Sequence, residues 1–542
     1  MKEFIEAPEK IYLEAKRDGR LIENRSLEEI KRIALRQEGV RETQMGSIAV
    51  DSEPMSRAAP KTKNNIDSEF GEEEILLANQ AVETLRKRKV VSLDVPVGEN
   101  SEITARFLMP EKYAYLAYGL KLLFGGTEGR VADKPTYRII FFTNGKFEAN
   151  KRIKDVREKD VTIRLWMGSR RGEQTKICRN TTYLGEGKKG VFQFEDWRVK
   201  EIDKEGIFLH AGIRRDHLWV YDHKTERPEL IEKVTAIAGL TATGKTTTLC
   251  RKLARLPRER SEMIGDDGGS LRSDGSFTVF EPMGLYVKTD GIDREQPEIL
   301  GAALSLDAYL ENVSLSRYPY IPEFSNVNKT TNGRAVVLRE NIRIAIKELK
   351  ASKVDNIILL TRNHLMNAIS KLTREQATMQ LIYGESEESS GGIPTESGKF
   401  KREFFLDPFV VGNRLEHALK FYDILEEIEE KRGTPINCYL ANTGYIGEKK
   451  EKVELWDSLA VYIDLLKESI KFSDKPDALG YYYPVKCDRG KLSKLTALDK
   501  FGPATLEEKL QAFLKRRQEY IRGFESKWGP IPPKIKETLR YR

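Results

Sequence analysis

The strongest chemical pattern in the chain is a glycine-rich loop that ends in lysine and threonine. The segment Gly239-Leu-Thr-Ala-Thr-Gly-Lys-Thr246 matches G-x-x-x-x-G-K-[ST] and lies between an apolar run, Val234–Ala238, and a run with helical spacing. The backbone N–H groups of such a loop surround phosphate oxygens at a helix N-terminus, where the helix dipole favours anions. The lysine can reach the β- and γ-phosphates, and the final threonine can bind the magnesium of a nucleotide. The residues that we expect to bind the nucleotide here are Gly239, Leu240, Thr241, Ala242, Thr243, Gly244, Lys245, Thr246 and Thr247.

Two adjacent carboxylates follow this loop. The segment Ile264-Gly-Asp-Asp267 begins eighteen residues after Thr246, at the end of a short apolar stretch. Carboxylates close to bound phosphates could hold a second cation. Taken alone, however, an Asp-Asp-Gly-Gly sequence more often forms a solvated turn.

Two further segments carry residues with chemical potential. Tyr183-Leu-Gly-Glu-Gly-Lys-Lys-Gly190 contains a lysine pair between glycines, and Gly206-Ile-Phe-Leu-His210 places a histidine at the end of an expected strand. Considered alone, each segment could have a purely structural role. A lysine pair usually lies on a solvated hairpin, and a histidine at the end of a strand usually belongs to the core.

In chain order, these four segments resemble the ATP-type phosphoenolpyruvate carboxykinases. The likeness continues at Tyr286-Val-Lys-Thr, Gln296-Pro-Glu-Ile, Asn332-Gly-Arg334 and Leu440-Ala-Asn-Thr-Gly-Tyr, and it is firm from about residue 182 to 446. It implies an α/β fold with two domains and mixed sheets. An N-terminal domain, 1–205, would bind the organic acid, and a C-terminal domain, 206–542, would bind nucleotide and metal through the phosphate loop.

The resemblance also implies two metal sites. Lys189, His210 and Asp267 would hold a transition metal, typically Mn²⁺, between the γ-phosphate and the enolate, and Thr246 would hold the Mg²⁺ that accompanies ATP. A lysine ligand must be deprotonated, which a nearby cation and partial burial would favour.

The resemblance assigns the other charged residues to substrate and phosphate. Arg334 would contact both the transferred phosphoryl group and the organic acid. Lys188 and Lys245 would neutralise charge along the phosphoryl path, and Tyr183 would pack against the carboxylate or CO₂.

The chain departs from the family pattern at several positions. The second substrate arginine of the family corresponds most closely to Arg57, in Ser56-Arg-Ala-Ala-Pro-Lys-Thr-Lys63, with one extra residue before the proline; the alternative is a basic surface loop. In the family, one segment contacts the nucleotide base. The corresponding part of this chain retains only the lysines within 449–452, so Lys452 and Ser458 are the candidate contacts. Base and donor preference therefore stay open.

The implied reaction joins a decarboxylation to a phosphoryl transfer. Oxaloacetate would lose CO₂ to give the enolate of pyruvate, whose oxygen would attack the γ-phosphate of ATP to give phosphoenolpyruvate and ADP. Three alternatives remain. They are a carboxykinase-fold enzyme with another donor (GTP or pyrophosphate) or another organic acid, a kinase that shares only the phosphate loop, and a nucleotide-dependent regulatory module.

Composition narrows the class of protein. The chain has 542 residues and a formal charge of +8, of which the last 42 residues contribute +5 through ten Lys/Arg against five Asp/Glu. The remaining body is close to neutral, which disfavours a general nucleic-acid binder. No segment approaches the ~20 apolar residues of a membrane span, the start of the chain lacks a signal-peptide pattern, and the four cysteines form no C-x-x-C pair. We expect a cytoplasmic enzyme, a monomer or small homo-oligomer, with no nucleic-acid or membrane partner.

The periodicity predicts the elements that must position these residues. Helices are expected at 72–88, at 414–432 ending before Gly433, and at 506–524 as a basic amphipathic helix docked on the body. Leu249, Leu253 and Leu256 share one helical face, which predicts a helix through 256. The expected strands lie at 89–95, 139–142, 161–166, 190–194, 206–210, 234–238, 356–360 and 438–441. The segment Glu385–Ser397, rich in Ser, Glu and Gly, is a candidate lid.

Overall fold

The computed structural model of the chain describes every residue except Arg57, 100–101, 128, 144–160, 223–224, 240–242, 388–399, 492–494 and 540–542. The described residues form two compact units. Unit 1 comprises Met1–Phe208 and Thr278–Arg343, and unit 2 comprises Leu209–Phe277 and Ile344–Arg542. Residues 278–343 cluster with unit 1 because strands from this segment share a sheet with a strand near residue 50. The compact units are therefore discontinuous in sequence, and the functional division at 205/206 stays a prediction.

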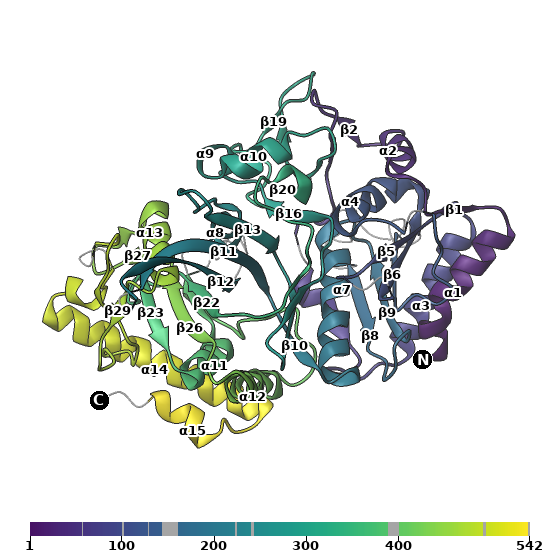
Figure 1. Cartoon of the computed structure of the whole chain (residues 1–542). Helices are drawn as coiled ribbons and strands as arrows, with labels where there is room; N and C mark the ends of the chain where they lie inside the picture. The colour runs from purple at the N-terminus through teal and green to yellow at the C-terminus, as the bar shows by residue number, and fades with distance from the viewer. Residues whose placement is uncertain are drawn as a thin grey trace. The chain divides into compact units, whose positions relative to one another are not determined.

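Unit 1 contains a mixed seven-stranded sheet in the order β1-β5-β6-β7-β9-β8-β4. Its strands are β1 (Leu21–Glu23), β4 (Thr62–Asn64), β5 (Val90–Pro96), β6 (Thr104–Pro110), β7 (Tyr137–Phe142), β8 (Thr162–Trp166) and β9 (Gln174–Arg179). Helices α1 (Lys2–Arg17) and α3 (Glu72–Arg86) lie side by side and contribute Phe4, Ile11 and Leu77 to an apolar core with this sheet (Figure 1).

A second sheet of unit 1 has the order β16-β20-β17-β3-β2. Its strands are β2 (Arg41–Glu42), β3 (Ile48–Val50), β16 (Gly284–Lys288), β17 (Tyr309–Glu311) and β20 (Arg334–Leu338), and a short hairpin joins β18 (Ser314–Leu315) to β19 (Pro322–Glu323). Helix α4 (Ala114–Phe124) contacts strands of both sheets. The other α-helices among the described residues of this unit are α2 (Leu27–Leu35), α7 (Leu184–Trp197), α9 (Ile292–Glu295) and α10 (Pro297–Ala303).

Unit 2 is built on a mixed six-stranded sheet in the order β13-β11-β12-β22-β26-β23. Its strands are β11 (Ala211–Asp222), β12 (Arg227–Gly239), β13 (Arg260–Gly265), β22 (Asn356–Thr361), β23 (Ile369–Leu372) and β26 (Asn437–Asn442), with β12, β22 and β26 parallel. Helix α11 (Arg374–Tyr383) contacts β23 and β26 and lies beside α12 (Arg414–Arg432) and α14 (Pro503–Trp528) (Figure 1). The remaining α-helices in the part of unit 2 that the structure describes are α8 (Lys245–Cys250), α13 (Leu455–Leu466) and α15 (Pro533–Lys536). The α/β fold with mixed sheets is confirmed.

The described residues also form several smaller sheets. One has the order β10-β14-β15-β21, with β10 (Gly206–Leu209), β14 (Gly269–Arg272), β15 (Phe277–Val279) and β21 (Lys350–Ala351), and the chain passes from one unit to the other within β10 and β15. Three hairpins pair β24 (Glu385–Glu387) with β25 (Phe400–Arg402), β27 (Tyr445–Ile446) with β28 (Glu451–Lys452), and β29 (Lys471–Phe472) with β30 (Pro484–Lys486).

Two expectations about local structure are wrong. Residues 190–194 were expected as a strand but lie inside α7, which buries every residue from Leu184 to Asp196 and so lacks the one-sided apolar pattern that identifies a helix. Helix α8 ends at Cys250 instead of continuing to Leu256. The hydroxyl of Ser261 accepts the N–H groups of Leu253 and Ala254, at 2.9 and 3.0 Å, and so directs the chain away from a helical path.

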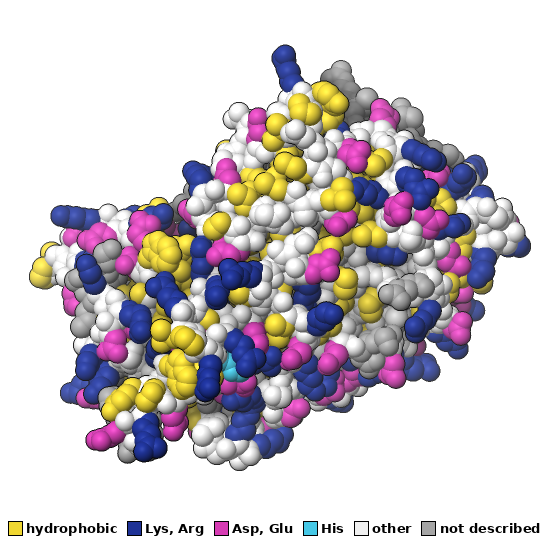
Figure 2. All heavy atoms as spheres, turned by 45° about the horizontal axis from the view of Figure 1, so that its top comes forward, with side chains coloured by type: hydrophobic (Ala, Val, Ile, Leu, Met, Phe, Trp, Pro, Cys, Tyr) yellow, Lys and Arg dark blue, Asp and Glu magenta, His cyan; other side chains and the backbone are white. Residues whose placement is uncertain are grey.

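The surface described here is charged but mixed. Figure 2 shows Lys and Arg side chains interspersed with Asp and Glu over the visible face. Among the described helices, none has both the length and the apolar character that a bilayer span requires.

Candidate active site

The glycine-rich loop lies where its pattern predicts, between the end of β12 at Gly239 and the start of α8 at Lys245. Gly244 precedes the helix with a φ of +88°, a conformation that side-chain-bearing residues rarely adopt. A Cβ at Gly239 would lie 2.3 Å from the Thr243 hydroxyl, so a side chain at this position would collide with that residue. Leu240, Thr241 and Ala242 lie outside the described residues.

Three predicted site residues of unit 2 meet at one carboxylate. His210 directly follows β10, and its Nε2 lies 3.0 Å from Oδ1 of Asp267, which follows β13. The ammonium group of Lys245 contacts the same oxygen. A histidine, a lysine and an aspartate thus converge from three separate segments beside the glycine-rich loop.

The other predicted metal-binding residue of unit 2 faces the neighbouring carboxylate. The Thr246 hydroxyl lies 3.0 and 3.1 Å from the two carboxylate oxygens of Asp266. Asp266 belongs to the acidic pair that the sequence offers for a second cation, although the family resemblance assigns a metal only to Asp267. Both members of the acidic pair therefore face phosphate-loop side chains.

Two residues that sequence reasoning missed hold the loop and its helix in place. Arg214 on β11 is fully buried, forms two 2.7 Å contacts with Asp216, and donates to the Thr248 and Leu249 carbonyls at the end of α8. Thr443 donates a 2.7 Å hydrogen bond from its hydroxyl to the Thr243 carbonyl. Thr443 belongs to the Asn-Thr-Gly segment noted in the sequence, whereas nothing in the sequence distinguishes Arg214 from a surface strand residue.

In unit 1 the predicted lysine pair lies on α7 and is buried. The Lys188 ammonium group is 2.9 Å from Glu281. Lys189 lies 3.8 Å from Glu186, a carboxylate that Lys176 also contacts, at 3.1 Å. Burial alone would raise the pKa of the Glu186 carboxyl, but the ammonium groups of Lys189 and Lys176 outweigh it and lower this pKa to about 2. Glu186 is therefore ionised while both lysines carry their charge.

Tyr183 and Arg334 meet through one asparagine. The side-chain oxygen of Asn332 accepts from the Arg334 Nε and Nη2 atoms at 3.2 and 2.9 Å. Its amide nitrogen donates to the Tyr183 hydroxyl at 3.3 Å and to the Met55 carbonyl at 2.8 Å. Asn332 is thus a further site residue, and its signal was the Asn-Gly-Arg segment itself.

The predicted site residues are divided between the two units. Lys245, Thr246, His210 and Asp267 belong to unit 2, whereas Tyr183, Lys188, Lys189 and Arg334 belong to unit 1. Arg57 lies outside the described residues, as does the candidate lid from 388 onward; the start of that lid forms β24.

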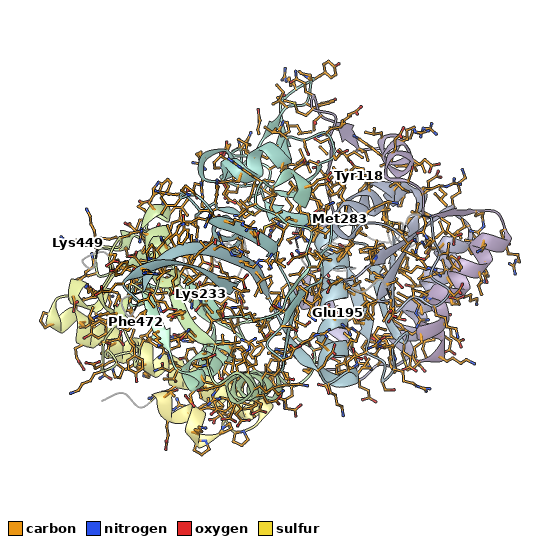
Figure 3. All side chains as sticks on the ribbon, in the orientation of Figure 1. Tyr118, Glu195, Lys233, Met283, Lys449 and Phe472 are labelled. Carbon is orange, nitrogen blue, oxygen red and sulfur yellow. The ribbon has the colours of Figure 1, made fainter. Side chains whose placement is uncertain are left out.

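The residues predicted to contact the base lie on the β27–β28 hairpin and on α13. Lys452 is exposed and forms a 3.4 Å ion pair with Glu454. Ser458 lies in the first turn of α13, where its amide donates to the Glu454 carbonyl. Lys449 is exposed and extends outward from the same hairpin (Figure 3). Their role in binding the base stays a prediction.

The donor atoms of unit 2 suit a divalent metal. An imidazole nitrogen and carboxylate oxygens are ligands that Mn²⁺ accepts, and a hydroxyl beside a carboxylate suits Mg²⁺. Among the described residues there is no cluster of three or more His, Cys, Asp and Glu that could hold a metal. That count omits lysine, which is one of the three predicted ligands.

Comparison with known proteins gives a consistent result. The family model described as phosphoenolpyruvate carboxykinase matches residues 19–489. A protein of Aeropyrum pernix named phosphoenolpyruvate carboxykinase (ATP) is 27% identical over 367 residues, which cover 67% of this chain and 70% of the relative. Proteins with the same name are 31% identical over 281 residues in Campylobacter jejuni and 25% identical over 429 residues in Emericella nidulans.

The extent of these matches decides the family. The Campylobacter alignment covers 51% of this chain and 47% of the relative, and the Emericella alignment covers 75% and 65%, so this chain spans about half to two thirds of those relatives. The family match, in contrast, covers segments of both units and every residue of the candidate site. A kinase that shared only the phosphate loop would not produce a match of this length. The chain belongs to the phosphoenolpyruvate carboxykinase family.

Proposed function

We propose that this chain is a phosphoenolpyruvate carboxykinase that converts oxaloacetate and ATP into phosphoenolpyruvate, CO₂ and ADP with the help of divalent metals. The observation that carries the proposal is the meeting of the phosphate-loop lysine, Lys245, and His210 at Asp267, in a chain that belongs to this family. A regulatory module would have no need for that set of side chains.

Unit 2 would bind and activate the nucleotide. Lys245 would neutralise the β- and γ-phosphates, and Thr246 and Asp266 would hold the Mg²⁺ of ATP. His210 and Asp267 would bind Mn²⁺, with Lys189 as the third ligand on the basis of the family resemblance. A metal held there would stabilise the negative charge that develops on the phosphoryl and enolate oxygens.

Unit 1 would bind the organic acid. Arg334 would pair with a carboxylate of oxaloacetate, Asn332 would fix the plane of its guanidinium group, and Tyr183 would lie beside the carboxylate that leaves as CO₂. Cleavage of the bond to CO₂ leaves its electron pair in the enolate, and Lys188 would stabilise the enolate oxygen. That oxygen would then form the bond to the γ-phosphorus as the bond to ADP breaks, a step that depends mainly on positioning and charge neutralisation.

Lys189 can bind a metal only as the neutral amine. The carboxylate of Glu186 is shared by Lys189 and Lys176. When Lys189 gives up its proton to bind a cation, Lys176 can still neutralise this carboxylate. The buried trio therefore supports a lysine ligand without leaving Glu186 unpaired.

The assay that tests the function follows phosphoenolpyruvate with oxaloacetate, Mn²⁺ and either ATP, GTP or pyrophosphate. We expect product with ATP, and no product once a chelator removes the metal. Product with GTP or pyrophosphate alone would favour the alternative of a changed donor, which the altered base segment keeps open. Nucleotide binding without product from any donor would favour a regulatory module.

We also propose that the enzyme works in the cytoplasm as a monomer or small homo-oligomer on small molecules alone. All four cysteines are free thiols, and Cys178, Cys250 and Cys438 are buried. Burial raises the pKa of the Cys178 and Cys438 thiols to about 12, which keeps them protonated and unreactive. Such thiols suit a reducing compartment.

A further inference from the structure

One aromatic ring in unit 1 touches three residues of the proposed substrate site. Tyr286 lies on β16, and its ring centre is 5.5 Å from the Lys188 ammonium nitrogen and 5.6 Å from the Arg334 guanidinium carbon. The Tyr183 ring packs against it edge to face, with 6.2 Å between the ring centres. Cations over an aromatic face are attracted by its quadrupole. Tyr286 therefore connects the residues that would bind the carboxylates and the enolate.

The hydroxyl of this tyrosine is held by a buried acid. Tyr286 donates to Oε2 of Glu311, a fully buried residue at the end of β17. Strand β20 lies between β16 and β17, so this bond reaches across β20, where Arg334 is the register partner of Glu311. The pair thus encloses the strand that carries Arg334.

The same acid also holds the helix that carries the lysine pair. Oε1 of Glu311 accepts the backbone N–H of Leu184, the first residue of α7, at 2.9 Å. The first N–H groups of a helix have no partner within the helix. Glu311 provides one from another element, so it fixes the start of α7 and the Tyr286 hydroxyl together.

The raised pKa values of Tyr286 and Glu311 are consistent with a hydrogen bond from the tyrosine hydroxyl to the carboxyl group. Burial raises the pKa of the Glu311 carboxyl to about 7, against the lowering effect of its hydrogen bonds and of Arg334. Burial also raises the pKa of Tyr286 well above its usual value. The tyrosine therefore keeps its proton and donates it in the hydrogen bond.

We propose that Tyr286 and Glu311 are positioning residues for oxaloacetate: Glu311 fixes the Tyr286 hydroxyl and the start of α7, and the Tyr286 ring fixes Lys188 and Arg334. The proposal rests on the carboxykinase function, because it assigns these residues to the substrate site of that reaction. Neither residue needs to touch the reacting atoms.

The test compares Tyr286→Phe, Glu311→Gln and the double variant with Tyr309→Phe in the full chain. Tyr309 lies on β17, is fully buried, and its hydroxyl has no hydrogen-bond partner among the described residues, so its loss is a matched control. Steady-state rates of phosphoenolpyruvate formation are measured against oxaloacetate and against ATP, from pH 6 to pH 9.

Tyr286→Phe and Glu311→Gln should each raise KM for oxaloacetate about tenfold, the loss expected for one hydrogen bond to a charged group, and leave KM for ATP within about twofold. The double variant should lose little more than the worse single variant, because both changes break the same bond. In the wild type kcat/KM should rise as the pH passes about 7 and Glu311 ionises, and Glu311→Gln should remove this rise.

Three results would overturn the inference. The first is an unchanged KM for oxaloacetate in Tyr286→Phe and Glu311→Gln, with wild-type activity intact. The second is an equal change in Tyr309→Phe, which would indicate a general effect of losing a buried hydroxyl. The third is a wild-type chain that makes no phosphoenolpyruvate, which would overturn the proposed function as well and so be distinct from the first two.

Discussion

Among individual side chains, Asp267 carries the greatest share of the proposed chemistry. Its carboxylate contacts both His210 and Lys245, so the same group would serve the metal and the phosphate loop. If one of these three side chains is removed, the other two keep charges that are no longer balanced. The site is then destabilised by more than the loss of a single contact would cause.

We therefore expect His210→Ala and Asp267→Asn each to reduce phosphoenolpyruvate formation by orders of magnitude, while the fold is kept. His217→Ala is the matched control, because this histidine lies on β11 and pairs only loosely with Glu232 and Glu262, at 3.9 and 3.8 Å. Turnover is measured at saturating substrates, together with the melting temperature. Near-normal turnover in both site variants would refute the metal assignment.

The raised pKa of the Glu311 carboxyl also predicts that the stability of the folded chain depends on pH. Its folded-state pKa of about 7 lies above the ordinary 4.5, so between these values the folded chain holds a proton that the unfolded chain releases. Stability should therefore fall as the pH rises from about 4.5 to 7 and level off above, by on the order of 3 kcal/mol in total.

Thermal melts of the wild type and of Glu311→Gln from pH 5 to pH 8 measure this effect. The variant has no proton to lose at this position, so its melting temperature should gain on that of the wild type as the pH rises. A constant difference between the two proteins across this range would contradict the raised pKa.

Among the helices and strands, those with a one-sided apolar pattern could be predicted from sequence. The helix from Arg414 to Arg432 has the predicted bounds and ends at Gly433, whose φ of +70° suits a helix end. Helix α14 likewise has the expected amphipathic pattern and buries Leu510 and Phe513, and Ser26 and Glu29 form a capping box at the start of α2. In each case local sequence and tertiary packing favour the same structure.

The missed features depend on partners that are distant in sequence. Helix α7 is buried on all sides, so its sequence shows no helical period, and the end of α8 depends on Ser261, eleven residues beyond Cys250. The motif residues of the candidate site were predicted from their order along the chain. Arg214 and Glu311 were not, because their partners lie on other elements, α8 for Arg214 and both β16 and α7 for Glu311.

A buried ion pair anchors helix α14, and its removal should destabilise the protein. Arg517 is 1% exposed, lies 2.6 Å from Glu385 on β24, and packs over the Phe513 ring at 4.7 Å. Arg517→Leu should lower the free energy of unfolding by about 3–5 kcal/mol, because Glu385 stays buried with one partner fewer.

The neighbouring Arg516→Leu is the matched control, since Arg516 is exposed on the same helix and should change stability by no more than about 0.5 kcal/mol. Denaturant titrations of the two variants give the comparison. Equal stability of both variants would show that α14 is not anchored through Arg517.

For the molecule as a whole, the charge distribution supports small anionic partners. Helix α14 buries one face and contributes only +2 of the +5 carried by the last 42 residues, with six Lys/Arg against four Asp/Glu. In the candidate site, by contrast, the side chains of Lys188, Lys189, Lys245 and Arg334 are buried. A net charge of +8 would not reveal these interior lysines and arginines. Their number suits a polyphosphate and a dicarboxylate better than a nucleic acid.

The most direct test follows the γ-phosphoryl group. The full chain is incubated with oxaloacetate, Mn²⁺, Mg²⁺ and ATP labelled in the γ-phosphate, and the products are separated. We predict that the label moves to phosphoenolpyruvate with one CO₂ released per transfer, and that Lys245→Ala abolishes the transfer. Label that stays in ATP, or that is found only in inorganic phosphate while oxaloacetate is converted to pyruvate or left unchanged, would contradict the carboxykinase function.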